Sequence, residues 1–266
     1  MTLRAALPAL LLAACASAGP SIATLRDARF ILLGEVHDNA EQHRQRAALL
    51  RELLADGRPT RVVFEQMGAV HDAAIAAARR NAEALAVAGR LDRDAWRWPL
   101  HRPLIEAALA GGATIAGGDL ERDQVRAIVR GGLDAAPADI RRTLADDASW
   151  GAADQQALQR IVEAAHCNAL PASQVAPMAL AQRARDAALA RAMLRAPPGT
   201  RAVLIAGNGH VRNDLGVPHY LRAAGVAPSA IVAIGFVERG DDEAAVYDAV
   251  RVTAKADRTD PCAAFR

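Results

Sequence analysis

The sequence predicts an α/β fold in which a mostly parallel β-sheet is flanked by helices. Short, continuous apolar runs alternate with longer segments of helical spacing, the pattern of strands that are linked by helical crossovers. Several apolar runs end in glycine and polar residues, as buried parallel strands do at their carboxyl ends. The chain has 266 residues, 52% of them hydrophobic, which is enough for one sizeable core.

Six strands are expected, and the helices between them are uneven in length. The strands are expected at 29–38, 61–67, 113–119, 201–210, 229–238 and 244–252. Helices are expected at 41–55, 69–89 and 96–110, the last interrupted by prolines. The segment 121–193 is almost wholly helical, with breaks near Gly131, Pro137 and Pro171. Because one crossover needs far fewer residues, we expect a small helical sub-lobe at about 121–195 within a domain of 25–253, followed by a C-terminal tail of 254–266.

The N-terminus has the pattern of a bacterial lipoprotein signal. Arg4 precedes a ten-residue apolar run, which is too short for a bilayer, since a spanning helix needs about 20 residues. The run ends in Leu12-Ala13-Ala14-Cys15, which resembles a lipobox. We therefore expect a signal peptide at 1–14, lipidation of Cys15 and a tether at 15–24; an ordinary secretory signal is the alternative. Ala16 follows the cysteine, and by resemblance to lipoprotein sorting rules this favours the outer membrane.

Two further cysteines remain after Cys15. In an oxidising compartment, Cys167 and Cys262 are expected to form a disulfide, and two free thiols are the alternative. The formal net charge is +2, and no arginine-rich helix face with interleaved aromatic residues is present. Nucleic acid is therefore not an expected partner.

Candidate chemistry lies at the predicted strand ends. The first strand ends in Glu35 and His37, the second in Glu65, and the fourth in His210. Ligands of open parallel sheets bind beyond the carboxyl ends of the strands, so these side chains are expected to converge. Imidazoles with carboxylates form divalent-metal sites, such as Zn or Fe, or general acid–base pairs. A hydrogen-bonded buried network is the alternative.

One predicted helix adds two polar residues to this set. Gln182 and Asp186 lie on an otherwise apolar helical face. Buried polar groups need partners, so Asp186 and Gln182 are expected to support the histidine cluster from behind. A salt bridge from Asp186 to a neighbouring arginine is the alternative.

Several segments carry a family resemblance, and they occur in the family's order. They are LLGEVHDNAEQHRQRAALL, VVFEQM, the Trp96-Arg97-Trp98 stretch, AQRARDAALARAML and AGNGHVRNDLGVPHYL. Together they resemble the ChaN-like haem-binding lipoproteins of the Tiki superfamily, which also contains metal-dependent proteases and erythromycin-esterase-like relatives. The resemblance implies an α/β domain with a small helical domain, and binding of haem or another iron cofactor at the outer membrane for iron uptake. It also implies that His37, Glu65 and His210, with Glu35 beside them, match the superfamily's metal or catalytic set.

The chain departs from this family at one position. Related sequences tend to have a tyrosine shortly after the double tryptophan, where it would ligate haem, and His101 stands there instead. His101 is therefore the expected haem ligand, Tyr220 the alternative, and Trp98 and Arg102 the expected neighbours of the porphyrin. The expected partners are haem or an iron complex, the membrane through the lipid anchor, and a second copy of the chain. A metal-dependent hydrolase that uses Glu35, His37, Glu65 and His210 is the alternative function.

Overall fold

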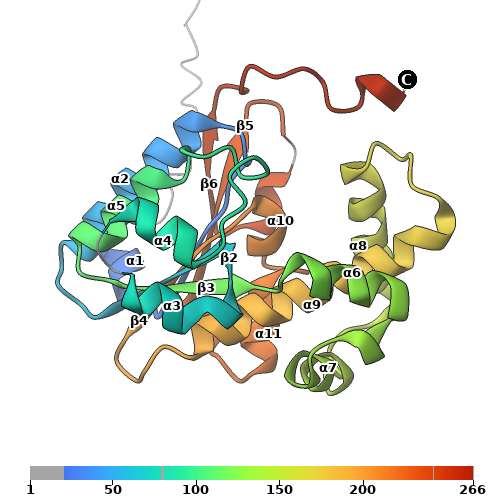
Figure 1. Ribbon diagram of the computed structural model, residues 1–266, viewed down its shortest axis with the longest axis horizontal. Helices are drawn as coiled ribbons and strands as arrows, with labels where there is room; N and C mark the ends of the chain where they lie inside the picture. Colours follow the sequence, from blue (N-terminus) through green and yellow to red (C-terminus); the bar gives the residue numbers. More distant parts are fainter. Residues whose placement is uncertain (1–20, 79–80, 242, 266) are drawn as a thin grey trace, which may run out of the picture.

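The computed structural model describes residues 21–78, 81–241 and 243–265, and its centre is one six-stranded parallel sheet. The strands lie in the order β3-β2-β4-β1-β5-β6, and each neighbouring pair is parallel (Figure 1). Their bounds are β1 (Phe30–Leu33), β2 (Thr60–Gly68), β3 (Thr114–Asp119), β4 (Arg201–Ile205), β5 (Ile231–Glu238) and β6 (Ala249–Thr253). The predicted α/β class is confirmed.

Helices cover both faces of the sheet. They are α1 (Ile22–Asp27), α2 (Ala40–Leu54), α3 (Asp72–Ala77), α4 (Ala82–Ala88), α5 (Arg102–Ala110), α6 (Arg122–Gly131), α7 (Ala138–Ala145), α8 (Ala152–Ala165), α9 (Ala172–Leu194), α10 (Asn208–Val211) and α11 (Val217–Ala223). One core packs α2, α4 and α5 against one face, and a second packs α9 and α11 against the other. Figure 1 shows α6, α7 and α8 gathered around the long α9, at the side of the sheet.

Two helices that the sequence predicted differ in the structure. The segment 69–89 contains a 3₁₀ turn and two short helices, α3 and α4, with residues 79–80 outside the described ranges. The segment 96–110 becomes helical only at Arg102, and the residues before it form turns. Pro103 lies in the first turn of α5, where a missing N–H leaves no helical hydrogen bond unmade. The helix therefore begins beside this proline and does not extend through it.

A bulge shifts the register between β2 and β3 near the carboxyl edge. Phe64 pairs with Gly117, whereas Gly68 pairs with Asp119, so β2 advances four residues while β3 advances two. Gly117 makes this possible, because a Cβ at that position would lie 2.3 Å from the carbonyl oxygen of Gly68. The bulge changes which β2 side chains face the edge of the sheet.

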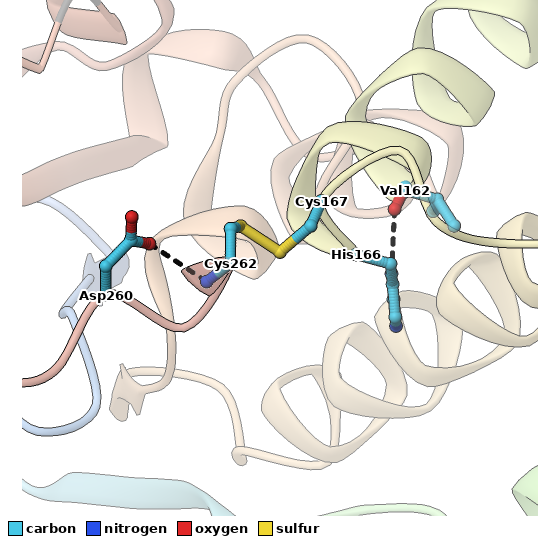
Figure 2. The surroundings of a disulfide bond; sticks show 5 residues. All are labelled: Val162, His166, Cys167, Asp260 and Cys262. Carbon is cyan, nitrogen blue, oxygen red and sulfur yellow. Dashed lines mark hydrogen bonds between the residues drawn. A yellow bond between two sulfur atoms is a disulfide. The ribbon is translucent and has the colours of Figure 1, made fainter. Parts of the chain in front are cut away.

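The C-terminal tail is attached to two parts of the molecule. Cys262 is bonded to Cys167, which follows α8, with the two Cα atoms 5.4 Å apart (Figure 2). Arg258 forms ion pairs with Asp38 and Glu238 at the edge of the sheet. The tail therefore joins the helical region to the body of the sheet.

The expectations for the N-terminus fall largely outside the described ranges. The signal peptide at 1–14 and Cys15 lie there. The tether is predicted to end at residue 24, and α1 begins at Ile22, where the Ser21 hydroxyl accepts a hydrogen bond from Thr24 N. Leu25 of this helix is buried in the core. Among the described residues, no helix is long and apolar enough to cross a membrane.

Gly117→Ala should destabilise the fold, because the added methyl group overlaps the backbone of Gly68. We expect a loss of about 1–3 kcal/mol in the free energy of unfolding, measured by urea denaturation. Gly209→Ala is the matched control, since a Cβ at Gly209 would meet no atom within 4 Å. Equal effects of both substitutions would contradict the role given to Gly117.

Candidate functional site

The predicted strand ends converge at the carboxyl edge of the sheet. β4 lies between β1 and β2, so the segments after these three strands are neighbours. Glu35 and His37 follow β1, Glu65 lies near the end of β2, and His210 lies in α10, which follows β4. The structure therefore brings all four residues into one region, as parallel topology requires.

Glu35 is a buried carboxylate that four cationic or imidazole side chains surround. Arg46 forms an ion pair with Oε2, and His43 Nδ1 lies 3.2 Å from the same oxygen. His101 Nε2 and His37 Nδ1 donate to Oε1 at 3.1 and 2.9 Å. Such a cluster satisfies a carboxylate that could not remain charged alone in the protein interior.

Helix α2 supplies two members of the Glu35 cluster. The helix begins after Asn39, whose Oδ1 accepts a hydrogen bond from Gln42 N at 3.2 Å. His43 and Arg46 are three residues apart, so both face the sheet. Arg46 Nη2 donates to His43 Nδ1 at 3.0 Å, and Nη1 donates to the carbonyl of Leu33 at 3.2 Å. Burial lowers the pKa of His43 to about 3, so this imidazole is neutral.

His37 has the most open side chain of the cluster. Its side chain is 48% exposed, and Trp96 packs edge-on against its ring, with 4.7 Å between centroids. The Nδ1–H donates to Glu35, which leaves a lone pair on Nε2, the nitrogen that lies near Gly207. Burial lowers the pKa of His37, although Glu65 acts in the opposite direction. His37 is therefore a neutral, oriented base or ligand, and within the described ranges no group is hydrogen-bonded to its Nε2.

Glu65 lies at the centre of a second charged network. It accepts hydrogen bonds from Gly207 N at 2.7 Å and from Arg185 Nη2 at 2.7 Å, and its Oε1 lies 3.2 Å from His210 Nε2. Burial favours the neutral acid, but His210 and Arg185 hold the pKa of Glu65 well below its usual value. A Cβ on Gly207 would lie 3.0 Å from His37 Nε2 and 3.7 Å from Glu65 Oε2. The two networks therefore meet at this glycine.

His210 is a cation between two carboxylates. Its Nδ1 donates to Asp186 at 2.6 Å and its Nε2 donates to Glu65. Burial opposes its charge, yet Glu65 and Asp186 raise the pKa of His210 to about 10. Gln182 Nε2 lies 3.0 Å from His210 Nδ1 and 3.5 Å from Asp186. Asp186 and Gln182 thus both contact Nδ1 of His210, in agreement with the sequence prediction that they support the histidine cluster.

Two cavities open beside this region and share His37, Glu65 and Arg185. The smaller cavity measures about 590 Å³ and is bounded by Trp96 and Met67, among others. The larger cavity measures about 960 Å³ and lies between the strand ends and α8. The shared residues stand where the two cavities adjoin.

The predicted haem ligand, His101, does not face either cavity. It is fully buried, Nε2 donates to Glu35, and Nδ1 lies 3.2 Å from the carbonyl oxygen of Trp96. Burial and Arg46 lower the pKa of His101 to about 3. In this structure His101, which the sequence predicts as a haem ligand, is a buried partner of Glu35.

The other predicted porphyrin neighbours also lie elsewhere. Tyr220 is buried in the core, its hydroxyl accepts a hydrogen bond from Arg183 at 3.1 Å, and burial raises its pKa. Arg102 pairs with Glu106 at a separate surface groove. Trp98 packs against the core under Arg93. These three residues do not line the two cavities beside His37.

The predicted metal set of His37, Glu65 and His210 also meets a physical obstacle. Both nitrogens of His210 lie within hydrogen-bond distance of a carboxylate, Nδ1 of Asp186 and Nε2 of Glu65, so this histidine would have to lose a proton before it could bind a metal. In the described part of the chain, Glu35, His43 and His101 form a different group. Each offers one possible metal-binding atom, and these three atoms lie within 4.8 Å of one another. Arg46 already pairs with that carboxylate and donates to His43. Both sets are satisfied from within the protein.

Sequence reasoning missed three residues of the site. They are His43, Arg46 and Arg185. Helical spacing after the GEVHDN segment gave a signal for the first two, because positions 39, 42, 43 and 46 share one face. No local sequence pattern indicates the role of Arg185, because its contacts with Asp119 and Glu65 join residues that are far apart in the sequence.

His210→Gln should remove a pH dependence of stability. A folded pKa of about 10 and an unfolded value of about 6.5 give a stabilisation that is complete below pH 6.5 and is lost as the pH rises through 10. We expect the wild type to exceed the variant in free energy of unfolding at pH 6, with the difference shrinking by pH 10. Urea denaturation across this range measures it. For His166→Gln, at an exposed histidine, the difference in free energy of unfolding from the wild type should not change with pH. If the difference for His210→Gln were equally independent of pH, the charged state of His210 would be contradicted.

Comparisons with known proteins are consistent with the topology. Residues 21–221 match a family model described as haem-binding uptake, Tiki superfamily, ChaN. A solved structure described as cofacial haem binding to ChaN of Campylobacter jejuni is 19% identical, with a TM-score of 0.71 over 86% of this chain and 89% of that chain. An erythromycin esterase mutant, EreC H289N, is 17% identical, with a TM-score of 0.45 over 82% of this chain and 72% of that chain.

The family match and the structural match carry different weight. At these identities a structural likeness shows a shared fold only, and the lower TM-score of the esterase supports no functional argument. No curated protein matches the sequence. The family model, by contrast, covers most of the chain. The chain belongs to the ChaN family of haem-binding uptake proteins in the Tiki superfamily.

Proposed function

We propose that this protein binds haem in the smaller cavity, with His37 as the ligand of the iron, and serves haem or iron uptake. The observation that carries the proposal is the state of His37. Its imidazole is neutral, half-exposed and held by Glu35 at Nδ1, so Nε2 keeps the lone pair that a metal ligand needs. Haem supplies the iron that such a nitrogen binds.

The smaller cavity fits a group of this size and character. Its volume of about 590 Å³ lies within the usual range for cofactor sites. Met67, Leu120, Val125 and Trp96 offer apolar or aromatic surface to a porphyrin. Arg90 and Arg122 also line this cavity and offer positive charge to carboxylates. The ligand that the sequence suggested at position 101 is thus replaced by His37, a residue of the same chemistry.

The geometry supports the hydrolase alternative less well. That function needs His210 as a metal ligand, and both of its nitrogens are committed to carboxylates. Haem binding through His37 requires no change in the Glu65 network.

Titration with ferric hemin tests the proposal. The wild type should bind hemin saturably with a shift of the Soret band, and His37→Ala should lose that shift and bind at least about tenfold more weakly. His166→Ala is the control, because His166 lies on the larger cavity only. Tyr220→Phe should also behave as wild type, since Tyr220 lines neither cavity. A Soret shift that survives in His37→Ala and disappears in another of these variants would refute the assignment.

We also propose that the chain is anchored to the outer membrane through a lipid on Cys15. The lipobox-like segment Leu12 to Cys15 supports this, and α1 begins only a few residues later. Cys15→Ala should move the protein from the membrane fraction to the soluble periplasmic fraction, as immunoblotting of the fractions would show. A variant that stays membrane-bound with unchanged mobility would disprove the anchor.

A further inference from the structure

Two buried glutamines near the site differ in their hydrogen bonding. Gln42 is fully buried, its Oε1 accepts from Val36 N at 2.7 Å, and its Nε2 donates to Thr253 at 3.0 Å. Gln66 is 3% exposed, and neither its Nε2 nor its Oε1 has a partner in the described part of the chain. An unpaired buried amide is costly to the folded state, so its presence requires an explanation.

The β2 bulge explains why Gln66 lies on the smaller cavity. Successive residues of a regular strand point to opposite faces, but Glu65 and Gln66 both line this cavity. The register between β2 and β3 slips within this segment, between Phe64 and Gly68. Gly117 leaves room for the slip. The local backbone thus presents two consecutive polar side chains to one cavity.

Arg90 lines the same cavity, next to the end of β2. Gly68 N donates to the carbonyl of Gly89 at 3.4 Å, and a Cβ on Gly89 would lie 2.7 Å from Met67 Sδ, so the two segments are in contact. Arg90 has φ = 52°, a left-handed conformation that is unusual for a residue with a side chain. Its guanidinium forms no ion pair or hydrogen bond with any residue that the structure describes.

We propose that Gln66 and Arg90 form a carboxylate-binding subsite of the smaller cavity. Gln66 Nε2 would donate to the carboxylate, and the Arg90 guanidinium would neutralise its charge. The Gln66 side chain has three rotatable bonds, so its amide turns towards a ligand without movement of the strand. This inference rests on the proposed function, in which the carboxylates are the two propionates of haem.

Metal-free protoporphyrin IX and its dimethyl ester separate carboxylate recognition from iron ligation. Fluorescence titration of the wild type should show at least about tenfold tighter binding of the diacid than of the diester. Gln66→Met and Arg90→Met should each weaken diacid binding and leave diester binding unchanged. Arg93→Met is the control for Arg90, because Arg93 pairs with Glu83 and does not line the cavity. It should bind both porphyrins as the wild type does.

The ligand-free protein offers an independent measurement. Gln66→Met removes an unpaired amide, so it should raise the melting temperature by about 2–4 °C. Gln42→Met removes a paired amide of the same size and should lower the melting temperature. Opposite shifts in these two variants would identify Gln66 as a group kept for a ligand at the expense of stability.

The outcomes separate the subsite from the proposed function. Equal binding of diacid and diester by the wild type, with hemin binding intact, overturns the subsite alone. A fall in melting temperature for Gln66→Met as large as for Gln42→Met also overturns it, since Gln66 would then be structural. Failure of the wild type to bind hemin or either porphyrin overturns the proposed function, and the subsite with it.

Discussion

The buried carboxylate of Glu35 is the interaction on which the rest of the site depends. A charge in the protein interior persists only when opposite charge and hydrogen-bond donors surround it. Arg46 supplies the charge from α2, His101 approaches from the turn before α5, and His37 returns from the loop after β1. One carboxylate therefore fixes three segments of the chain. Without it, the fully buried guanidinium of Arg46 would lose its ion pair.

His37 and His210 each stand three residues after a glycine, Gly34 and Gly207, yet their charge states are opposite for a simple reason. His37 contacts one carboxylate, which Arg46 already balances, and half of its side chain is exposed. His210 lies between two carboxylates, Glu65 and Asp186, and holds the proton for both. The same Gly-x-x-His spacing thus gives a neutral imidazole in one place and a cation in the other, and the difference comes from neighbours that no local pattern shows.

The sheet and the convergence of Glu35, Glu65 and His210 could be predicted because both follow from parallel topology. Continuous apolar runs identify strands that are buried on both faces, and their carboxyl ends must lie at one edge. The position of His101 could not be predicted, since its burial depends on Glu35, 66 residues earlier. The difference in hydrogen bonding between Gln42 and Gln66 could not be predicted either, because it depends only on which groups the fold places beside two identical side chains. The single helix predicted at 69–89 is wrong, because a 3₁₀ turn follows β2 and two short helices come after it. The alanine-rich sequence gave no indication of that turn.

The link between Cys167 and Cys262 sets an order of events in biosynthesis. Its second half, Cys262, lies 95 residues after the first half. The link cannot close until residue 262 has been made, whereas every strand of the sheet is complete by Thr253. The sheet can thus assemble before the disulfide attaches the end of α8, which lines the larger cavity, to the C-terminal tail. A chain that stops just before residue 262 would keep every strand and lose that fastening.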